Sequence, residues 1–377
     1  MGSLPVGGMV WQVIHNLVPL RRLGFDVWYV EDSDRPMYDL TRFEPNAAAP
    51  PENIARIGEY MSAIGLHDRW ALRVPRTRTI VGALDGNGLE HLYAQAVCGL
   101  NLCGAQDLED RHMGIAVRIY LQTDPVGTQV RVAQGDPATI SQLDRHNLFF
   151  TYGTRIGQPD CEVPHRYPWR ATVPPVCLDF WEGTNDPPVG AKLSTVLNWR
   201  HDDRDVTWNG QTWHWSKDRE FRRFFDIPSR SPLPLELCLG GANDADRAEI
   251  AAHGWGIKSS TDYMDPLAYR DYIVGSLGEF SAAKEMVVTT RSGWISDRTV
   301  CYLAAGRPAI VQDTGIGSVL PVGEGLLTFN SGGEALAAIE AVAADYRRHA
   351  RAARELAREY FDSERVLGAV MRIAGLC

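Results

Sequence analysis

A turn containing glycine, followed by a hydroxyl-rich helix start, is the part of this sequence best suited to bind an anion. The helix is predicted to begin at Ser296 and to end before Gly306. The first turn of a helix exposes unpaired backbone N–H groups and the positive end of the helix dipole, which together suit a diphosphate. The candidate binding residues are Arg291, Ser292, Gly293, Ser296, Asp297, Arg298 and Thr299. The alternative is an ordinary capped helix, with Ser296 as its N-cap.

A lysine follows a nearby strand and could supply positive charge to the same anion. Residues 279–281 form a short strand-like run that ends at Ser281, and Lys284 comes shortly after it. In open α/β sheets, ligands bind outside the carboxyl ends of the strands, so both residues are predicted to face the binding crevice. An ammonium group there can neutralise a diphosphate. The alternative is a surface lysine in a loop.

Two side chains are candidates for general-base chemistry. Asp124 ends a strand-like run just before Pro125, which places its carboxylate where it could take a proton from an acceptor hydroxyl. A turn-forming Asp-Pro pair is the alternative. His15, one to two turns into the first predicted helix, is the second candidate, with a packing role as its alternative. Gly7 and Gly8 precede that helix and would let a phosphate or sugar approach the backbone closely.

The sequence favours neither a metal site nor a bound dinucleotide. His201, Asp202 and Asp203 resemble a metal-binding cluster, but further ligands at a suitable spacing are missing, so a solvated loop is the better interpretation. A dinucleotide fingerprint needs a preceding strand and a third glycine, and Gly7-Gly8 has neither. We therefore expect no metal and no cofactor.

Strand-like and helical stretches alternate along most of the chain, which predicts parallel α/β sheets. Apolar residues recur at three- and four-residue spacing between residues 9 and 23, as on one face of a helix. Asn209-Gly210 predicts the turn of a hairpin over 206–213. The predicted strands span 25–30, 79–83, 98–103, 115–121, 147–152, 193–199, 233–239, 279–281 and 308–312.

The start of the chain departs from this pattern. A doubly wound domain normally begins with a strand that leads into the first glycine loop, yet only six residues precede Gly7. Either that strand lies outside this sequence through a misplaced start, or the first sheet is organised differently.

Length and composition limit the possible classes of protein. A chain of 377 residues predicts two domains, and six prolines between Asp160 and Pro188 predict the linker. The net charge of −9 excludes a nucleic-acid partner held by bulk charge. Seven cysteines without a Cys-x-x-Cys pair argue against disulfides and structural zinc. With no apolar run long enough to span a membrane, we expect a cytoplasmic protein without a membrane span.

The stretch from Arg291 to Phe329 also resembles a known class of protein. Its helix, A-A-G-R-P turn, strand, D-T-G and G-L-L-T-F segment, followed by the E-A-L-A-A-I helix, is similar to the donor-binding domain of GT-B glycosyltransferases. Near the N-terminus, G-G and then G-F-D-V-W-Y-V resemble the first helix and second strand of the same class. The resemblance in element order covers nearly the whole chain.

The resemblance implies two Rossmann-like domains that face each other across a cleft, with a C-terminal helix crossing back to the first. We expect an acceptor-binding domain over 1–173, a nucleotide-sugar donor-binding domain over 189–350 and the crossover helix over 351–377. The implied activity is metal-independent transfer of a sugar from a nucleotide-diphosphate sugar, as co-substrate, to a small-molecule or glycan acceptor. The class often places an arginine and a lysine on the donor diphosphate near the first strand of the second domain. Among Arg200, Arg204 and Lys217, which flank that strand and the hairpin, Lys217 is the better match, and the alternative is an exposed surface charge.

One departure from the class pattern leaves other functions open. The related retaining families carry two glutamates eight positions apart before the A-A-G-R-P turn, and Gly293 and Cys301 occupy those positions. Asp297, between them, is the nearest carboxylate. The donor site must therefore differ locally, and the alternatives are a nucleotide-sugar epimerase or a non-catalytic protein that binds a nucleotide sugar.

Overall fold

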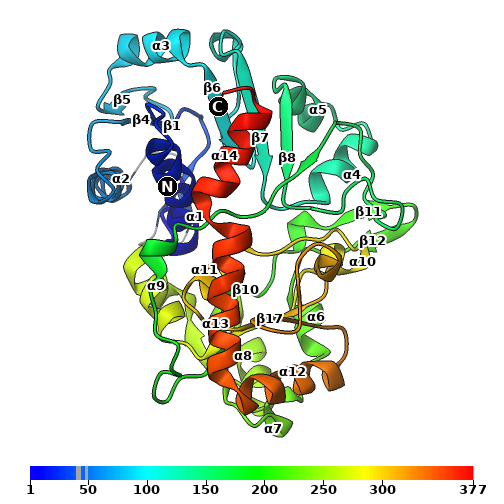
Figure 1. Ribbon diagram of the computed structural model, residues 1–377. Helices are drawn as coiled ribbons and strands as arrows, with labels where there is room; N and C mark the ends of the chain where they lie inside the picture. Colours follow the sequence, from blue (N-terminus) through cyan, green and yellow to red (C-terminus); the bar gives the residue numbers. More distant parts are fainter. Residues whose placement is uncertain (40–43, 47–49, 377) are drawn as a thin grey trace.

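The chain folds into two α/β lobes, with strands β1 to β9 in the first lobe and β10 to β17 in the second (Figure 1). The computed structural model describes residues 1–39, 44–46 and 50–376. The strands of the first lobe are β1 (Tyr29–Glu31), β2 (Met37–Asp39), β3 (Glu44–Asn46), β4 (Trp70–Arg73), β5 (Ile80–Gly82), β6 (Cys98–Leu102), β7 (Val117–Gln122), β8 (Leu148–Thr151) and β9 (Arg170–Ala171). Its helices are α1 (Gly7–Arg22), α2 (Pro51–Ala63), α3 (Gly86–Gln95), α4 (Gly127–Ala133) and α5 (Pro137–Asp144).

The first lobe divides its strands among separate sheets. One parallel sheet has the order β6-β7-β8-β9, and another has the order β1-β4-β5, with β5 antiparallel to β4. Among the described residues, α1 is the first element, and no strand precedes it. Only residues 29 and 30 of the predicted strand over 25–30 are paired, in β1, because the chain leaves α1 at Gly24 and needs several residues to reach β4.

The second lobe contains one parallel six-stranded sheet with the order β14-β13-β10-β15-β16-β17. Its strands are β10 (Leu193–Asn198), β13 (Leu235–Gly240), β14 (Gly256–Ser259), β15 (Gly278–Ser281), β16 (Ala309–Gln312) and β17 (Leu326–Phe329). The helices that accompany it are α6 (Asp218–Arg222), α7 (Ile227–Arg230), α8 (Asp244–Ala252), α9 (Pro266–Val274), α10 (Glu285–Thr289), α11 (Asp297–Ala304) and α12 (Gly332–Ala344). Numbered along the chain, these strands have the spatial order 3-2-1-4-5-6 of a doubly wound sheet. The direction of winding reverses between strands 1 and 4 of this numbering, which are β10 and β15.

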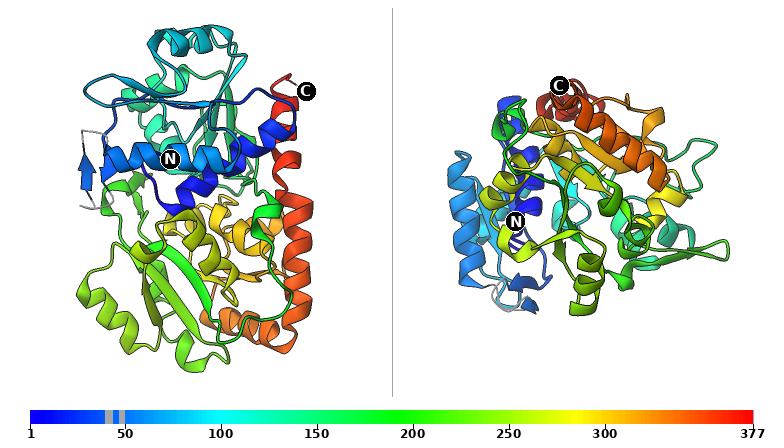
Figure 2. Two further views of the ribbon diagram at one scale, coloured as in Figure 1. Left: turned by 90° about the vertical axis from the view of Figure 1, so that its left-hand side faces the viewer. Right: turned by 90° about the horizontal axis from the view of Figure 1, so that it is seen from below.

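The C-terminal helices join the two lobes. Helix α13 (Tyr346–Leu356) packs on α11, a π-helical turn spans Ala357–Phe361, and α14 (Ser363–Ile373) packs on α1. Val370 and Met371 are buried against the sheet of the first lobe. The helices run beside both lobes in Figure 1 and in the left view of Figure 2. The crossing back to the first lobe, expected from the resemblance, is confirmed.

A hairpin of the second lobe reaches the first lobe. Strands β11 (Val206–Trp208) and β12 (Gln211–Trp213) are antiparallel, and Asn209 and Gly210 both have positive φ, as a two-residue type I′ turn requires. Gln134 Nε2 donates a hydrogen bond to the Thr207 carbonyl at 2.6 Å. The predicted hairpin is confirmed, and through this hydrogen bond it connects the second lobe to the first.

The arginine of the A-A-G-R-P turn fastens the interdomain linker to the second lobe. Arg307 is 2% exposed and donates hydrogen bonds to the carbonyls of Val274, Thr184 and Asp186 and to the Tyr346 hydroxyl, at 2.9–3.2 Å. Methionine at this position would leave these acceptors without a donor. We expect Arg307→Met to lower the free energy of unfolding by about 2–4 kcal/mol in urea titrations.

Arg347 provides the matched control for this prediction. Its side chain is 69% exposed and pairs with Asp186 at 2.7 Å, on the same linker. An exposed ion pair contributes little, so Arg347→Met is expected to change stability by about 0.5 kcal/mol or less. Equal losses for the two variants would contradict the special role of Arg307.

Over the described ranges, the structure contains no helix that is both long and apolar enough to cross a bilayer.

Candidate functional site

The carboxyl ends of β15 and β16 open into a pocket beside the reversal point of the sheet, which lies between β10 and β15. Ligands of doubly wound domains bind at this position, because the connections from the two strands leave toward opposite faces. Side chains of several elements meet in the pocket: Lys217, Ser281, Ala282, Ala283, Trp294, Ile295, Ser296, Arg298, Thr299, Val311, Gln312, Thr314 and Ile316. Five of the residues predicted as donor-binding thus line one pocket.

Lys217 is a buried lysine whose side-chain nitrogen has no partner among the described residues. It lies at the N-cap of α6 and is 7% exposed. In the part of the chain that the structure describes, its ammonium group makes no hydrogen bond and no ion pair. Burial, and then the positive charges of Arg298 and Lys284, lower the pKa of Lys217 well below its usual value. An anion entering the pocket would supply the missing counter-charge.

Helix α11 points its N-terminus at the same pocket. Ser296 is the N-cap, as the alternative interpretation of this helix had it, but its side chain makes no capping hydrogen bond and its Oγ donates to Asp297 Oδ1 at 3.3 Å. Asp297 Oδ1 also accepts the backbone N–H of Arg298 at 2.9 Å. The helix start therefore presents its dipole to the pocket, with the hydroxyl-bearing residues Ser296 and Thr299 in the lining.

Arg298 has a different environment from Lys217, because its guanidinium is fully engaged by the protein. It donates to Glu279 Oε1 at 2.7 Å, to the Val196 carbonyl at 2.7 Å and to Ser281 Oγ at 3.0 Å. These contacts join α11 to β10 and β15. The geometry favours a supporting role for Arg298 at the pocket wall, and direct contact with a donor stays a prediction.

Lys284 and Asp124 meet across the cleft. Lys284 Nζ of the second lobe lies 2.5 Å from Asp124 Oδ1 at the end of β7 in the first lobe. The ammonium is also 3.4 Å from the ring centroid of Trp215 and 5.6 Å from that of Trp294. Burial lowers the pKa of Lys284, and the charge of Asp124 opposes that effect. The two residues, predicted separately from the ends of two strands, lie together.

The residues before α11 form a seam between the lobes. The Arg155 N–H donates to the Ser292 carbonyl at 3.0 Å, and Thr154 Oγ1 donates to the Gly293 carbonyl at 2.7 Å. Gly293 has φ +71°, and a Cβ there would lie 2.4 Å from Thr154 Oγ1. The carbonyl of Arg291 accepts from Arg155 Nη1 at 3.2 Å. The segment 291–293 thus contacts the first lobe. The close approach of Thr154 accounts for a glycine at position 293, and no bound ligand is needed to explain it.

The glycine pair at the start of α1 is also in close contact with protein. A Cβ on Gly7 would lie 2.6 Å from Tyr269 Cβ of α9. Trp11 Nε1 donates to the Pro266 carbonyl at 2.7 Å, which holds α1 on α9. Gly7 therefore permits helix packing between the lobes, whereas Gly8 lines a second cavity.

His15 lies in the interface between the lobes. Its Nε2 is 3.0 Å from the indole N–H of Trp181 and its Nδ1 is 3.2 Å from the backbone N–H of Cys177. Burial lowers the pKa of His15 to about 3. Each ring nitrogen of His15 faces an N–H group of the protein, so neither nitrogen is open to a proton from a substrate. The geometry therefore favours a packing role for His15 and leaves Asp124 as the better candidate base.

Sequence reasoning missed several residues of the cleft. Trp294 lines the pocket and donates its indole N–H to the Thr123 carbonyl at 2.8 Å. Gln12 and Asn16 line the second cavity, and Gln12 Nε2 donates to Asp297 Oδ2 at 3.1 Å. The sequence did contain a signal for Gln12 and Asn16. Two amide side chains four residues apart lie on the same side of a helix, here beside the apolar face of the first predicted helix.

Two Rossmann-like lobes that meet at a cleft, with a C-terminal helix returning to the first, define the GT-B fold, and this chain has that fold. It is similar over 99% of its length to an α-glucosyltransferase solved in complex with UDP, with 12% identity, a TM-score of 0.53 and 97% of that chain covered. It is also similar to TarM, with 8% identity and a TM-score of 0.50, over 79% of this chain and 59% of TarM. No protein-family model and no curated protein matches the sequence.

Proposed function

We propose that the protein transfers a glycosyl group from a nucleotide-diphosphate sugar to a hydroxyl or amine of a small-molecule or glycan acceptor. The buried, unpartnered Lys217 beside the start of α11 carries this proposal, because its amine has no counter-charge in the free protein and would pair with an anion at the reversal point of the sheet. The GT-B fold supports it, since the α-glucosyltransferase with this fold was solved in complex with UDP. Lys217 and the α11 dipole would stabilise the diphosphate leaving group, so the transfer would need no metal.

The acceptor would bind on the first lobe, near Asp124. The carboxylate lies at the cleft end of β7 and is 39% exposed, so an acceptor hydroxyl can reach it. In the free protein Lys284 holds this carboxylate. A bound diphosphate would compete for the ammonium group and leave Asp124 free to accept a proton from the acceptor.

Calorimetric titration with UDP, GDP and dTDP, followed by donor turnover assays in cell extract, tests this function. We expect one diphosphate to bind and its sugar conjugate to be consumed only when an acceptor is present. Tight binding without any turnover would instead show a non-catalytic nucleotide-sugar protein. Conversion of the donor sugar without an acceptor, lost in Asp124→Asn, would show an epimerase.

Diphosphate binding is expected to be coupled to proton uptake by Lys217. The pKa of this lysine is lowered in the free protein, and a bound anion would raise it. Between the two pKa values, binding takes up a proton, so affinity falls as pH rises, by up to about tenfold per pH unit. Titrations in buffers of different ionisation enthalpy measure the uptake. Lys217→Met should abolish this proton uptake, and a wild-type affinity independent of pH would contradict the coupling.

A further inference from the structure

Glu279 places a carboxylate inside the sheet of the second lobe. It is the second residue of β15, it lies between Ser194 of β10 and Ala309 of β16, and its side chain is fully buried. Strands of a parallel sheet are normally apolar because both faces are covered, and glutamate is almost never fully buried without a partner. The carboxylate therefore requires an explanation other than the formation of the sheet.

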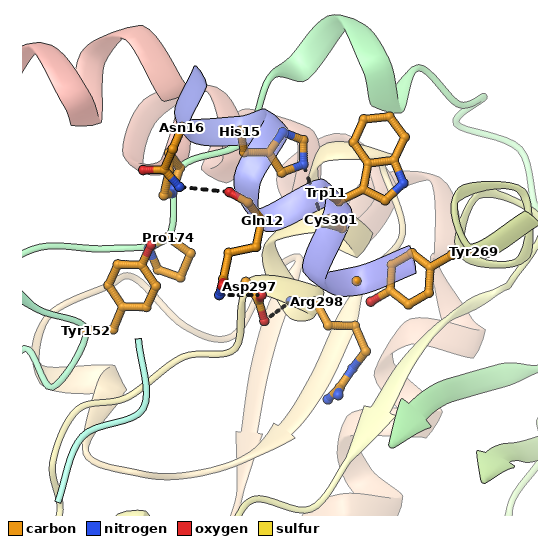
Figure 3. Close-up of a pocket in the computed structure, with 12 residues that line it drawn as sticks. Trp11, Gln12, His15, Asn16, Tyr152, Pro174, Tyr269, Asp297, Arg298 and Cys301 are labelled. Atoms are coloured by element: carbon orange, nitrogen blue, oxygen red, sulfur yellow. Dashed lines mark hydrogen bonds between the residues drawn. The ribbon is translucent and has the colours of Figure 1, made fainter. Parts of the chain in front are cut away.

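The partner of Glu279 is Arg298, which lines the Lys217 pocket. Glu279 Oε1 accepts from Arg298 Nε at 2.7 Å and lies at the same distance from Nη2, whereas Glu279 Oε2 has no hydrogen-bond partner among the described residues. The Arg298 side chain extends away from α1 into the second lobe, where the guanidinium also contacts Val196 and Ser281 (Figure 3). The ion pair thus fixes one charged side chain of the pocket wall.

The pair limits how much positive charge the pocket offers. Lys217 and Arg298 are the two basic residues of the lining, and over the described chain only Lys217 has no acidic partner. Burial is the main cause of the lowered pKa of Lys217, the charge of Arg298 adds to it, and the charge of Glu279 opposes it. Charges removed from water interact strongly, so without Glu279 the guanidinium would add an unpaired charge to the pocket.

The amount of positive charge affects the donor and the product differently. The terminal phosphate of a free nucleoside diphosphate ionises a second time near neutral pH, so it carries about one negative charge more than its sugar conjugate. An additional unpaired cation therefore stabilises the bound product more than the bound donor. A pocket with two unpaired cations would retain its product.

We propose that Glu279 is a positioning residue that holds and neutralises Arg298, and that it thereby limits the affinity of the pocket for the released nucleoside diphosphate. The inference rests on the proposed function, in which the diphosphate lies at Lys217. Glu279 does not line the pocket, and it acts on the ligand through the charge and the position of Arg298.

Calorimetric titrations of Glu279→Gln with UDP and UDP-glucose test the inference, or the GDP or dTDP series if that diphosphate binds the wild type better. Glutamine keeps the shape and an acceptor for Arg298 but removes the counter-charge. We expect UDP to bind about 10-fold more tightly and UDP-glucose about 3-fold more tightly. The added charge also opposes protonation of Lys217, but it acts on a single charge there and on several charges of the ligand.

The unfolding temperature of Glu279→Gln should fall, because a buried ion pair loses one partner. Tighter binding together with lower stability separates the proposed role from a purely structural one, since damage to the sheet would weaken both.

The double variant Glu279→Gln, Arg298→Met removes both charges and leaves their sum as in the wild type. Its affinity for UDP should return to within about 2-fold of the wild-type value. Uncharged replacement of a buried ion pair is often tolerated, so this variant tests the inference even if Glu279→Gln does not fold. Weaker binding than in the wild type would show that Arg298 already contributes its charge to the ligand, and would overturn the inference.

Glu236→Gln is the matched control. Glu236 has the same register as Glu279 on the other side of Ser194, is 7% exposed and pairs with Lys192 at 2.8 Å, and neither residue lines the Lys217 pocket. This variant should lower the unfolding temperature and leave the affinity for UDP unchanged. Unchanged or weaker UDP binding in Glu279→Gln, or an equal gain in Glu236→Gln, would overturn the inference and leave the proposed function intact. If the wild type binds none of the diphosphates, the proposed function fails, and this inference fails with it.

Discussion

Lys217→Met is expected to weaken nucleoside diphosphate binding about 100-fold while leaving the protein at least as stable. The affinity falls because a buried ammonium that pairs with an anion contributes several kcal/mol once both are removed from water. Stability does not fall because Lys217 is buried without a partner, so methionine, of similar length and without charge, removes a desolvation cost. Calorimetric titration and urea unfolding of the same samples measure the two effects.

The opposite directions of these two effects separate a binding residue from a structural one. A lysine that supports the fold would lose stability on replacement and keep its affinity for the diphosphate, and that pair of results would contradict the proposal. Lys258→Met on β14 is the matched control, because Lys258 is exposed at the far edge of the same sheet. It should change neither the affinity nor the stability appreciably.

Much of the fold could be predicted because short-range patterns determine it. The Asn209-Gly210 turn, the helix ended by Gly306 and the alternation of strands and helices depend on neighbours in sequence. Strand β4 was missed because its four residues carry no alternation, and Arg73 at its end is tolerated only through its ion pair with Asp32. That pair joins distant segments, which local patterns do not reveal.

The glycines show where prediction of the site reached its limit. Glycine indicates that something approaches the backbone closely, without indicating what approaches. A ligand was predicted at Gly7 and Gly293, but Tyr269 and Thr154 of the facing lobe lie there. In contrast, Asp124 and Lys284 could be predicted to share the cleft, because each follows a parallel strand whose carboxyl end faces it. The burial of Lys217 depends on segments distant in sequence, such as the end of β15 and the start of α11, so its sequence context gave little signal.

Asp124→Asn is expected to lower kcat about 100- to 10,000-fold with little loss of donor affinity. A general base contributes an effect of this size, because without it the acceptor hydroxyl keeps its proton as the new bond forms. Donor binding should persist, since the substitution removes a negative charge beside the cationic pocket and frees Lys284 from its 2.5 Å ion pair. Steady-state kinetics at varied donor concentration separate kcat from the donor KM.

The ion pair provides the test that distinguishes a base from a partner that only holds Lys284. If Asp124 acts as the base, Lys284→Met should raise the donor KM and retain most of kcat, whereas the Asp124→Asn, Lys284→Met double variant should lose kcat as fully as Asp124→Asn alone. If Asp124 only positions the lysine, Lys284→Met alone should reproduce the loss of kcat, and the second substitution should add nothing. The kcat of Lys284→Met decides between the two roles. It should stay near the wild-type value if Asp124 is the base, and it should fall as far as in Asp124→Asn if Asp124 only positions the lysine.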